Sequence, residues 1–192
     1  MTEKNAEKSG ARLSPNRVSF KHLAVVLPDS KAHVTFWSLA LGGLILDLWT
    51  KKAVFGWLEH QDSFPIVNGF LQLVTALNNG AAFGMFAGRS YLLTAVSATA
   101  LAVILAVFLF GGSRQRLVHV ALGLFAAGVC GNLYDRVFND GLVRDFIDVH
   151  YREYRWPAFN VADSLLCIGV GLLIISTFLI ERLARRHGRQ RK

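Results

Sequence analysis

One stretch decides the fold. It reads Gly131-Asn132-Leu133-Tyr134-Asp135-Arg136, then Val143-Arg144-Asp145-Phe146-Ile147-Asp148, then Phe159-Asn160-Val161-Ala162-Asp163. Apolar segments long enough for helices flank the stretch on both sides. The stretch holds five aspartates: Asp135, Asp140, Asp145, Asp148 and Asp163. Carboxylates are costly where a chain leaves and re-enters a membrane. The stretch is therefore the first candidate for a functional site in a membrane protein.

The composition supports a membrane protein of one domain. The 192 residues are 53% hydrophobic and 18% charged, with a mean hydropathy of +0.37, whereas globular chains carry about 25% charged residues. The net charge is +8, but no basic-aromatic pattern indicates nucleic-acid binding. Cys130 and Cys167 lie in apolar runs without disulfide or zinc spacing, so we expect them to pack in helices. We expect no metal or other cofactor.

Four apolar segments predict transmembrane helices at about residues 32–49, 91–110, 117–133 and 159–180. Together they form a predicted four-helix transmembrane domain over residues 32–181. Residues 1–31 lack the apolar core of a signal peptide and predict a disordered basic tail. Residues 182–192 predict a second basic tail.

The distribution of Lys and Arg predicts the orientation in the membrane. Six lie in residues 1–31, two in residues 111–116 and six in residues 181–192. The positive-inside rule places all three regions in the cytoplasm, which requires an even number of spans. The two acidic connections, residues 53–90 and 136–158, then face outward.

The first outer connection contains a predicted β-hairpin. Phe64-Pro65-Ile66-Val67 and Phe70-Leu71-Gln72-Leu73-Val74-Thr75 flank the pair Asn68-Gly69. Asn-Gly favours a two-residue turn with a positive φ at both central residues. We therefore expect a small sheet on the outer side.

The unusual polar residues converge on the same outer side. Asp47 ends the first span, Asn78 precedes the second, and Asp145 lies in the second outer connection. On the third span, Asn132 shares a helix face with its neighbours at i+3 and i+4, which are Asp135 and Arg136. Asn160 and Asp163 also share a face, at the start of the fourth span. Because the orientation came only from Lys and Arg, this convergence is a separate observation.

Paired carboxylates are the chemistry that best fits these residues. The sequence has neither the His-Glu-x-x-His of zinc proteases nor the Gly-x-Ser-x-Gly of serine hydrolases. Two close carboxylates share one proton, so one acts as a base and the other as an acid at one pH. Asp145 and Asp163 are the best candidates for such a dyad, which could activate water against a peptide carbonyl.

The other carboxylates have structural interpretations. Asp140 and Asp148 fit solvated loop charges. Asp135 could pair with an arginine, either Arg136 or Arg144. Asp47 could pair with Lys51, four residues later on its helix, a spacing that contributes little when exposed. Lys51 and its neighbour Lys52 close the first span and could extend toward the membrane interface.

Five motifs in order resemble one known family. They are Asp47-x-x-Thr50-Lys51, Asn78-x-Gly80-Ala81-Ala82-Phe83, Gly131-Asn132-Leu133-x-Asp135-Arg136, Val143-x-Asp145-Phe146-Ile147-Asp148 and Phe159-Asn160-x-Ala162-Asp163. The resemblance is to lipoprotein signal peptidase (signal peptidase II), a bacterial aspartic protease of the inner membrane, and it covers about residues 34–181. It implies four transmembrane helices, a small periplasmic β-cradle formed by the hairpin, and a periplasmic loop helix.

The resemblance also implies an activity and the residues that perform it. The family's catalytic motifs fall on Asp145 and Asp163, the pair chosen above. Its substrate-binding and supporting residues fall on Asp47, Lys51, Asn78, Gly80, Asn132, Arg136, Asn160 and Ala162. The family removes signal peptides from prolipoproteins by cutting before a diacylglyceryl-modified cysteine. The implied partners are lipid-modified prolipoproteins and membrane lipids, and we expect a monomer whose active site faces the periplasm.

Small departures from the family pattern concern substrate preference. Leu48 replaces a common Gln, and Leu77 and Asn79 replace common His and Thr residues. Two other classes of function stay open on the residues alone. A small proton-coupled carrier would spread polar groups across the bilayer, and a scaffold subunit would leave the convergent aspartates unexplained.

Overall fold

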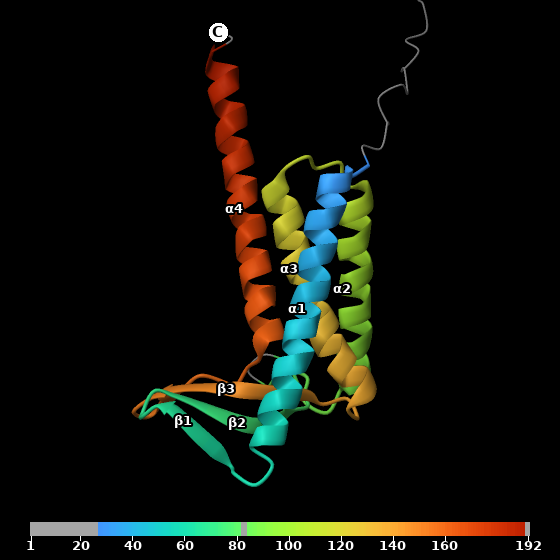
Figure 1. Cartoon of the computed structure of the whole chain (residues 1–192). Helices are drawn as coiled ribbons and strands as arrows, with labels where there is room; N and C mark the ends of the chain where they lie inside the picture. The colour runs from blue at the N-terminus through green and yellow to red at the C-terminus, as the bar shows by residue number, and fades with distance from the viewer. Residues whose placement is uncertain (1–26, 82–83, 191–192) are drawn as a thin grey trace, which may run out of the picture.

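The computed structural model describes residues 27–81 and 84–190. Its four helices are α1 (Ser30–Trp57), α2 (Ser90–Phe110), α3 (Arg116–Phe138) and α4 (Val161–Gln190). Each contains a segment long and apolar enough to cross a membrane, which in α4 is Val161–Leu179. A small sheet lies across one end of the helices, and α4 ends at the opposite end (Figure 1). Of the tail predicted over residues 1–31, residues 1–26 lie outside the described residues.

The first helix extends beyond the span predicted over residues 32–49. α1 begins after Asp29, whose Oδ1 accepts a hydrogen bond from Ala32 N at 2.8 Å, a typical N-cap. It then runs past Trp49 to Trp57, about two further turns. The sequence suggested an end near Trp49 because Lys51 looked like an interfacial charge. Lys51 is instead 0% exposed, so the helix continues through it.

α3 is the central helix of the bundle. It packs against α1, α2 and α4. Of its most apolar membrane-length segment, 61% is buried, whereas the corresponding segments of the other three helices are 17–22% buried. Small residues on α3 allow this close approach. A Cβ added at Gly123 would lie 2.8 Å from Phe36 O of α1, and one at Gly128 would lie 2.7 Å from Leu166 of α4.

The predicted hairpin is present and belongs to a larger sheet. β1 (Ser63–Val67), β2 (Leu71–Asn78), β3 (Val143–Tyr151) and β4 (Tyr154–Arg155) follow this order in an antiparallel sheet. The turn after Val67 differs from the predicted type: Gly69 has a φ of 72°, but Asn68 is not in the positive region. A register shift near the turn accompanies this geometry, as in hairpins with a longer loop and a bulge.

The second outer connection contains two strands. Val143–Tyr151 pairs with β2 through Ala76↔Asp145 and Gln72↔Asp148. The periplasmic loop helix is not among the elements of the described residues; β3 and β4 occupy the segment between α3 and α4. This strand carries Asp145 under the end of the helices (Figure 1).

Candidate active site

Backbone pairing places Asp163 beside β3. Phe159 forms an antiparallel bridge with Ile147, with backbone hydrogen bonds of 2.8 and 3.0 Å. Asn160 then caps α4: its Oδ1 accepts from Asp163 N at 3.0 Å, and Asp163 Oδ2 accepts from Asn160 N at 3.1 Å. This reciprocal arrangement is a capping box. It fixes the Asp163 carboxylate in the first turn of α4, next to the strand that carries Asp145.

Asp145 is almost completely withdrawn from water, with 2% of its surface exposed. Its Oδ1 accepts from Asn160 Nδ2 at 2.6 Å, and its Oδ2 accepts from Asn78 Nδ2 at 3.0 Å. Burial, and after it the negative charge of Asp163, raises the pKa of Asp145 from 3.8 to about 7, against the opposing effect of the two amide donors. The charge of Asp163 is therefore near enough to disfavour ionisation of Asp145.

A buried lysine joins the three helices that surround this pair. Lys51 Nζ lies 2.7 Å from Asp47 Oδ2 and 3.1 Å from Asp135 Oδ2, and all three side chains are 0% exposed. Nζ also donates to Asn132 Oδ1 at 3.2 Å. The second oxygen of Asp47 accepts from Ala162 N at 2.8 Å. Lys51 thus links α1 to α3, and its partner Asp47 links α1 to α4.

Asp135 also binds Arg144, which decides between the two partners considered from the sequence. Arg144 donates from its backbone N to Asp135 Oδ2 at 3.0 Å, and from Nε and NH2 to Oδ1 at 3.1 and 2.5 Å. The cluster of Asp47, Lys51, Asp135 and Arg144 therefore holds two positive and two negative charges. Such balance is what permits charged groups to be buried. It also anchors the start of β3 to α3.

Arg136 lies on the other side of the pair and contacts the segment after β2. Its NH2 donates to Gly80 O at 3.1 Å and its NH1 to Asn132 O at 3.4 Å. Gly80 N in turn donates to Asn78 Oδ1 at 2.8 Å, which orients the amide that reaches Asp145. Arg136 Nε is buried and has no hydrogen-bond partner among the described residues.

These groups open into a pocket of about 730 Å³. Its polar lining consists of Asn78, Asn79, Asn132, Arg136, Asp145, Asp163 and Ser164, and Gly80 lies among them. The remainder is largely apolar and includes Leu77, Leu166 and Trp156. A binding or catalytic site is usually an apolar pocket into which a few polar groups converge.

All ten site residues chosen from the sequence lie in one connected set of contacts, which we call the aspartate network. Asn132 Nδ2 completes it by donating to Asp163 Oδ1 at 2.7 Å. Its members are Asp47, Lys51, Asn78, Gly80, Asn132, Arg136, Asp145, Asn160, Ala162 and Asp163. Within the described residues, no group of three or more His, Cys, Asp or Glu side chains is arranged to hold a metal ion.

Asp148 was expected to be a solvated loop charge, and this prediction is wrong. The residue is 2% exposed, and its Oδ2 accepts from Gln72 Nε2 at 2.5 Å. His150 Nδ1 lies 3.6 Å from the same oxygen. The alternation of apolar and polar residues over residues 147–151 was the available signal for a strand, since it has the period of two that strands require. Asp140, by contrast, is exposed as expected.

The family of the chain follows from comparison with known proteins. The family model described as Signal peptidase (SPase) II matches residues 39–179. The chain belongs to the signal peptidase II family. This family comprises aspartic proteases, so the family and enzyme class indicated by the five motifs are confirmed.

Individual relatives agree with this assignment. The chain is 41% identical over 150 residues to the lipoprotein signal peptidase of Geobacter sulfurreducens, a match that covers 77% of this chain and 93% of the relative. It is 35% identical over 151 residues to that of Halalkalibacterium halodurans, covering 79% and 96% of the two chains. A bacterial membrane enzyme solved by the in meso method at 2.3 Å resolution is similar with a TM-score of 0.67 and 35% identity, over 73% of this chain and 85% of that one.

These similarities confirm the predicted fold class and the multi-pass membrane character. They give no support to the carrier considered as an alternative. The positions of the polar groups agree, since the aspartate network lies at one end of the helices beside the sheet and not near their middle.

Proposed function

We propose that this chain is a lipoprotein signal peptidase that cuts prolipoproteins before a diacylglyceryl-modified cysteine, with Asp145 and Asp163 as the catalytic pair. One observation carries the assignment of residues. A buried carboxyl group with a pKa of about 7 interacts with a second carboxylate, and both line the same pocket. The similar proteins are lipoprotein signal peptidases, and they supply the substrate class.

In the proposed reaction, Asp163 acts as the base and Asp145 as the acid. Both Asp163 oxygens accept hydrogen bonds, and the residue lies at the N-terminus of α4, where the helix dipole stabilises a negative charge. Asp163 takes a proton from a water molecule, and the resulting hydroxide attacks the scissile carbonyl. Asp145, which is protonated near neutral pH, gives its proton as the peptide bond breaks and the amine leaves. No cofactor takes part in this proposal.

The remaining members of the aspartate network hold the pair and the substrate. Asn160 and Asn132 fix the two carboxylates through the amide contacts described above. Arg136 lines the pocket, and its buried Nε lacks a hydrogen-bond partner among the described residues, so a small movement of this side chain could offer Nε to a carbonyl of the substrate backbone. Gly80 allows two backbone segments to approach closely at the pocket, because a Cβ there would lie 3.0 Å from Met85 O.

The proposed setting is the bacterial inner membrane, with the enzyme acting as a monomer. Both termini and the link between α2 and α3 would lie in the cytoplasm, because these regions carry most of the Lys and Arg residues. The aspartate network would then lie at the periplasmic surface. Signal helices of prolipoproteins would approach through the lipid, with their acyl chains in the outer leaflet of that membrane.

The test uses the full chain purified in a neutral detergent. A diacylglyceryl-modified prolipoprotein and the same precursor with an unmodified cysteine are incubated separately, and the products are identified by mass spectrometry. We expect cleavage of the modified precursor directly before its lipidated cysteine, and little cleavage of the unmodified one. Equal cleavage of both precursors, cleavage elsewhere or no cleavage of either would contradict the proposal.

A further inference from the structure

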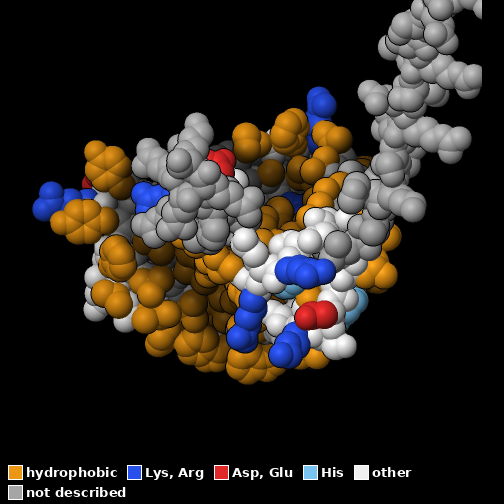
Figure 2. Space-filling view, turned by 90° about the horizontal axis from the view of Figure 1, so that it is seen from above, with side chains coloured by type: hydrophobic (Ala, Val, Ile, Leu, Met, Phe, Trp, Pro, Cys, Tyr) orange, Lys and Arg blue, Asp and Glu red, His pale blue; other side chains and the backbone are white. Residues whose placement is uncertain are grey.

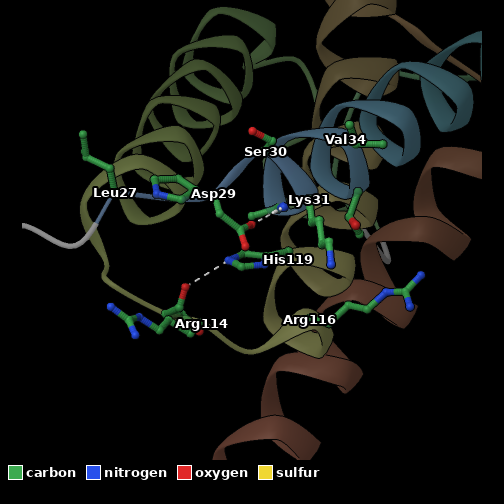
Figure 3. Close-up of a pocket in the computed structure, with 12 residues that line it drawn as sticks. Leu27, Asp29, Ser30, Lys31, Val34, Arg114, Arg116 and His119 are labelled. Atoms are coloured by element: carbon green, nitrogen blue, oxygen red, sulfur yellow. Dashed lines mark hydrogen bonds between the residues drawn. The ribbon is translucent and has the colours of Figure 1, made fainter.

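A second pocket lies at the opposite end of the helices from the aspartate network. It has a volume of about 840 Å³, and it is formed by the start of α1, the start of α3 and the link that precedes α3. Its titratable lining consists of Asp29, Lys31, Arg114, Arg116 and His119. In Figure 3 the ammonium end of Lys31 falls between the two arginines, whose guanidinium groups extend to either side. We call it the basic pocket.

The basic pocket has an excess of positive charge. Its three Lys and Arg side chains are exposed, and none has an ion-pair partner in the described part of the chain. The single carboxylate, Asp29, already accepts from Ala32 N through its Oδ1. His119 is 6% exposed, and its Nε2 lies 3.1 Å from Ser113 O. Because three cations face a single carboxylate here, the basic pocket is suited to binding an anion.

The starts of α1 and α3 add to this positive potential. Both helices have their first turns at the pocket, and helix N-termini carry a partial positive charge. The N-cap of α3, Gln115, makes no side-chain hydrogen bond to the helix, so its first N–H groups lack a side-chain acceptor. The partial positive charge of this helix end adds to the positive potential of the three cations, but it would not by itself define a site.

The lengths of the helices place the basic pocket at a membrane surface. α2 has 21 residues, or about 32 Å at a rise of 1.5 Å, which matches a hydrocarbon core of about 30 Å. The link after Phe110 therefore enters the headgroup layer. Figure 2, which looks onto this end, shows Lys and Arg side chains with a carboxylate and a histidine beside a hydrophobic surface.

Apolar side chains lie beside these charged groups in the lining of the pocket. Leu27 and Val34 line it and are 65% and 67% exposed. Both are labelled beside the charged groups in Figure 3. An anion that is joined to a hydrocarbon chain would use both parts of this surface, whereas a free inorganic anion would leave the apolar part uncovered. Basic pockets between transmembrane helices are known binding sites for acidic lipid headgroups.

We propose that the basic pocket binds an anionic phospholipid, with its phosphate among Lys31, Arg114 and Arg116 and its acyl chains along Leu27 and Val34. This proposal depends on the membrane setting proposed above and is independent of the peptidase chemistry. In that orientation the lipid belongs to the cytoplasmic leaflet.

The test measures lipid binding to the delipidated full chain in neutral detergent by native mass spectrometry. Phosphatidylglycerol, phosphatidylcholine and inorganic phosphate are titrated separately. The test protein carries Arg114→Gln with Arg116→Gln, and its control carries Lys52→Gln with Arg89→Gln. The control removes the same charge from exposed residues at the far end of α1 and α2.

Each cation near an acidic headgroup contributes roughly fivefold in affinity. We therefore expect the Arg114 and Arg116 double variant to bind phosphatidylglycerol about thirtyfold more weakly, while the control binds as the natural chain does. Asp29→Asn removes the opposing charge but keeps an oxygen for the N-cap, so we expect about fivefold tighter binding.

Three results would overturn the proposal. Phosphatidylcholine could bind as tightly as phosphatidylglycerol, or the control could lose as much affinity as the test protein. Inorganic phosphate could also displace phosphatidylglycerol at equal concentration, which would make a free anion the ligand. The Asp29→Asn variant gives an independent check, because a protein that had merely misfolded would not bind the lipid more tightly.

Discussion

Removing the amide of Asn78 should move the pH dependence of the enzyme in a defined direction. Asn78 Nδ2 donates to Asp145 Oδ2 at 3.0 Å, and this hydrogen bond lowers the pKa of Asp145 against the effect of burial. The proposed reaction needs Asp145 protonated, so activity should fall as the pH rises through about 7. Asn78→Ala removes a donor that favours the ionised form. The alkaline limb should therefore shift to higher pH.

The size of the shift follows from the energy of one charged hydrogen bond. A hydrogen bond to an ionised group contributes about 1.5–3 kcal/mol, and one pKa unit corresponds to about 1.36 kcal/mol. The limb should therefore move upward by about 1–2 units. Water that enters the space left by the amide would bring the shift toward the lower value. Because Asp145 interacts with Asp163, the measured value belongs to the pair.

The assay is kcat/KM for a lipidated precursor from about pH 5 to about pH 9, the range in which a shared carboxyl proton would be lost. Gln72→Ala is the matched control, since Gln72 donates to Asp148 on the same two strands and makes no contact with Asp145. Its limb should stay near pH 7. Asn78→Ala is also expected to lower the rate, because Asn78 orients Gly80, but the rate does not determine the position of the limb. An unmoved limb, or one that shifts to lower pH, would refute this reasoning.

Two further predictions concern stability, each measured as the free energy of unfolding in detergent. Lys51→Met leaves two buried carboxylates without their shared cation and should lower the free energy of unfolding by about 3–5 kcal/mol. Lys52→Met, at the exposed neighbouring position, should change it by no more than about 0.5 kcal/mol. Equal stability of the two variants would contradict the buried network. Gly131→Ala adds a methyl group against a carboxylate of α1 and should destabilise the protein, while Gly171→Ala, with nothing within 4 Å, should be neutral or stabilising. The reverse order would show that α1 and α3 approach less closely than described.

Local patterns in the sequence were sufficient for the helices and the first hairpin. The apolar segments are long, and their charged ends are distinct, so four spans could be placed without knowledge of the packing. Asn68-Gly69 between two β-prone runs identified the hairpin. The turn type was wrong because the bulge near Val67 depends on pairing with the rest of β2.

Long-range pairing explains what the sequence did not reveal. The burial of Asp148 requires β3 to lie against β2, a contact between segments about seventy residues apart. Lys51 looked like an interfacial lysine because its partners include Asp135 on α3, far along the chain. The identity of the site residues was accessible because they gather at helix ends on one side. The choice between Arg136 and Arg144 as the partner of Asp135 was not.

The central claim is that Asp145 and Asp163 together perform the hydrolysis. The most direct measurement compares cleavage of a lipidated prolipoprotein by the natural chain and by Asp145→Asn, Asp163→Asn and Asp148→Asn, after each variant is shown to be folded. Asp148 is the matched control, because it is a buried carboxylate of β3 that does not line the pocket. We expect Asp145→Asn and Asp163→Asn each to lose at least about a hundredfold in rate, and Asp148→Asn to retain most of it. Near-natural activity in either of the first two variants would contradict the claim.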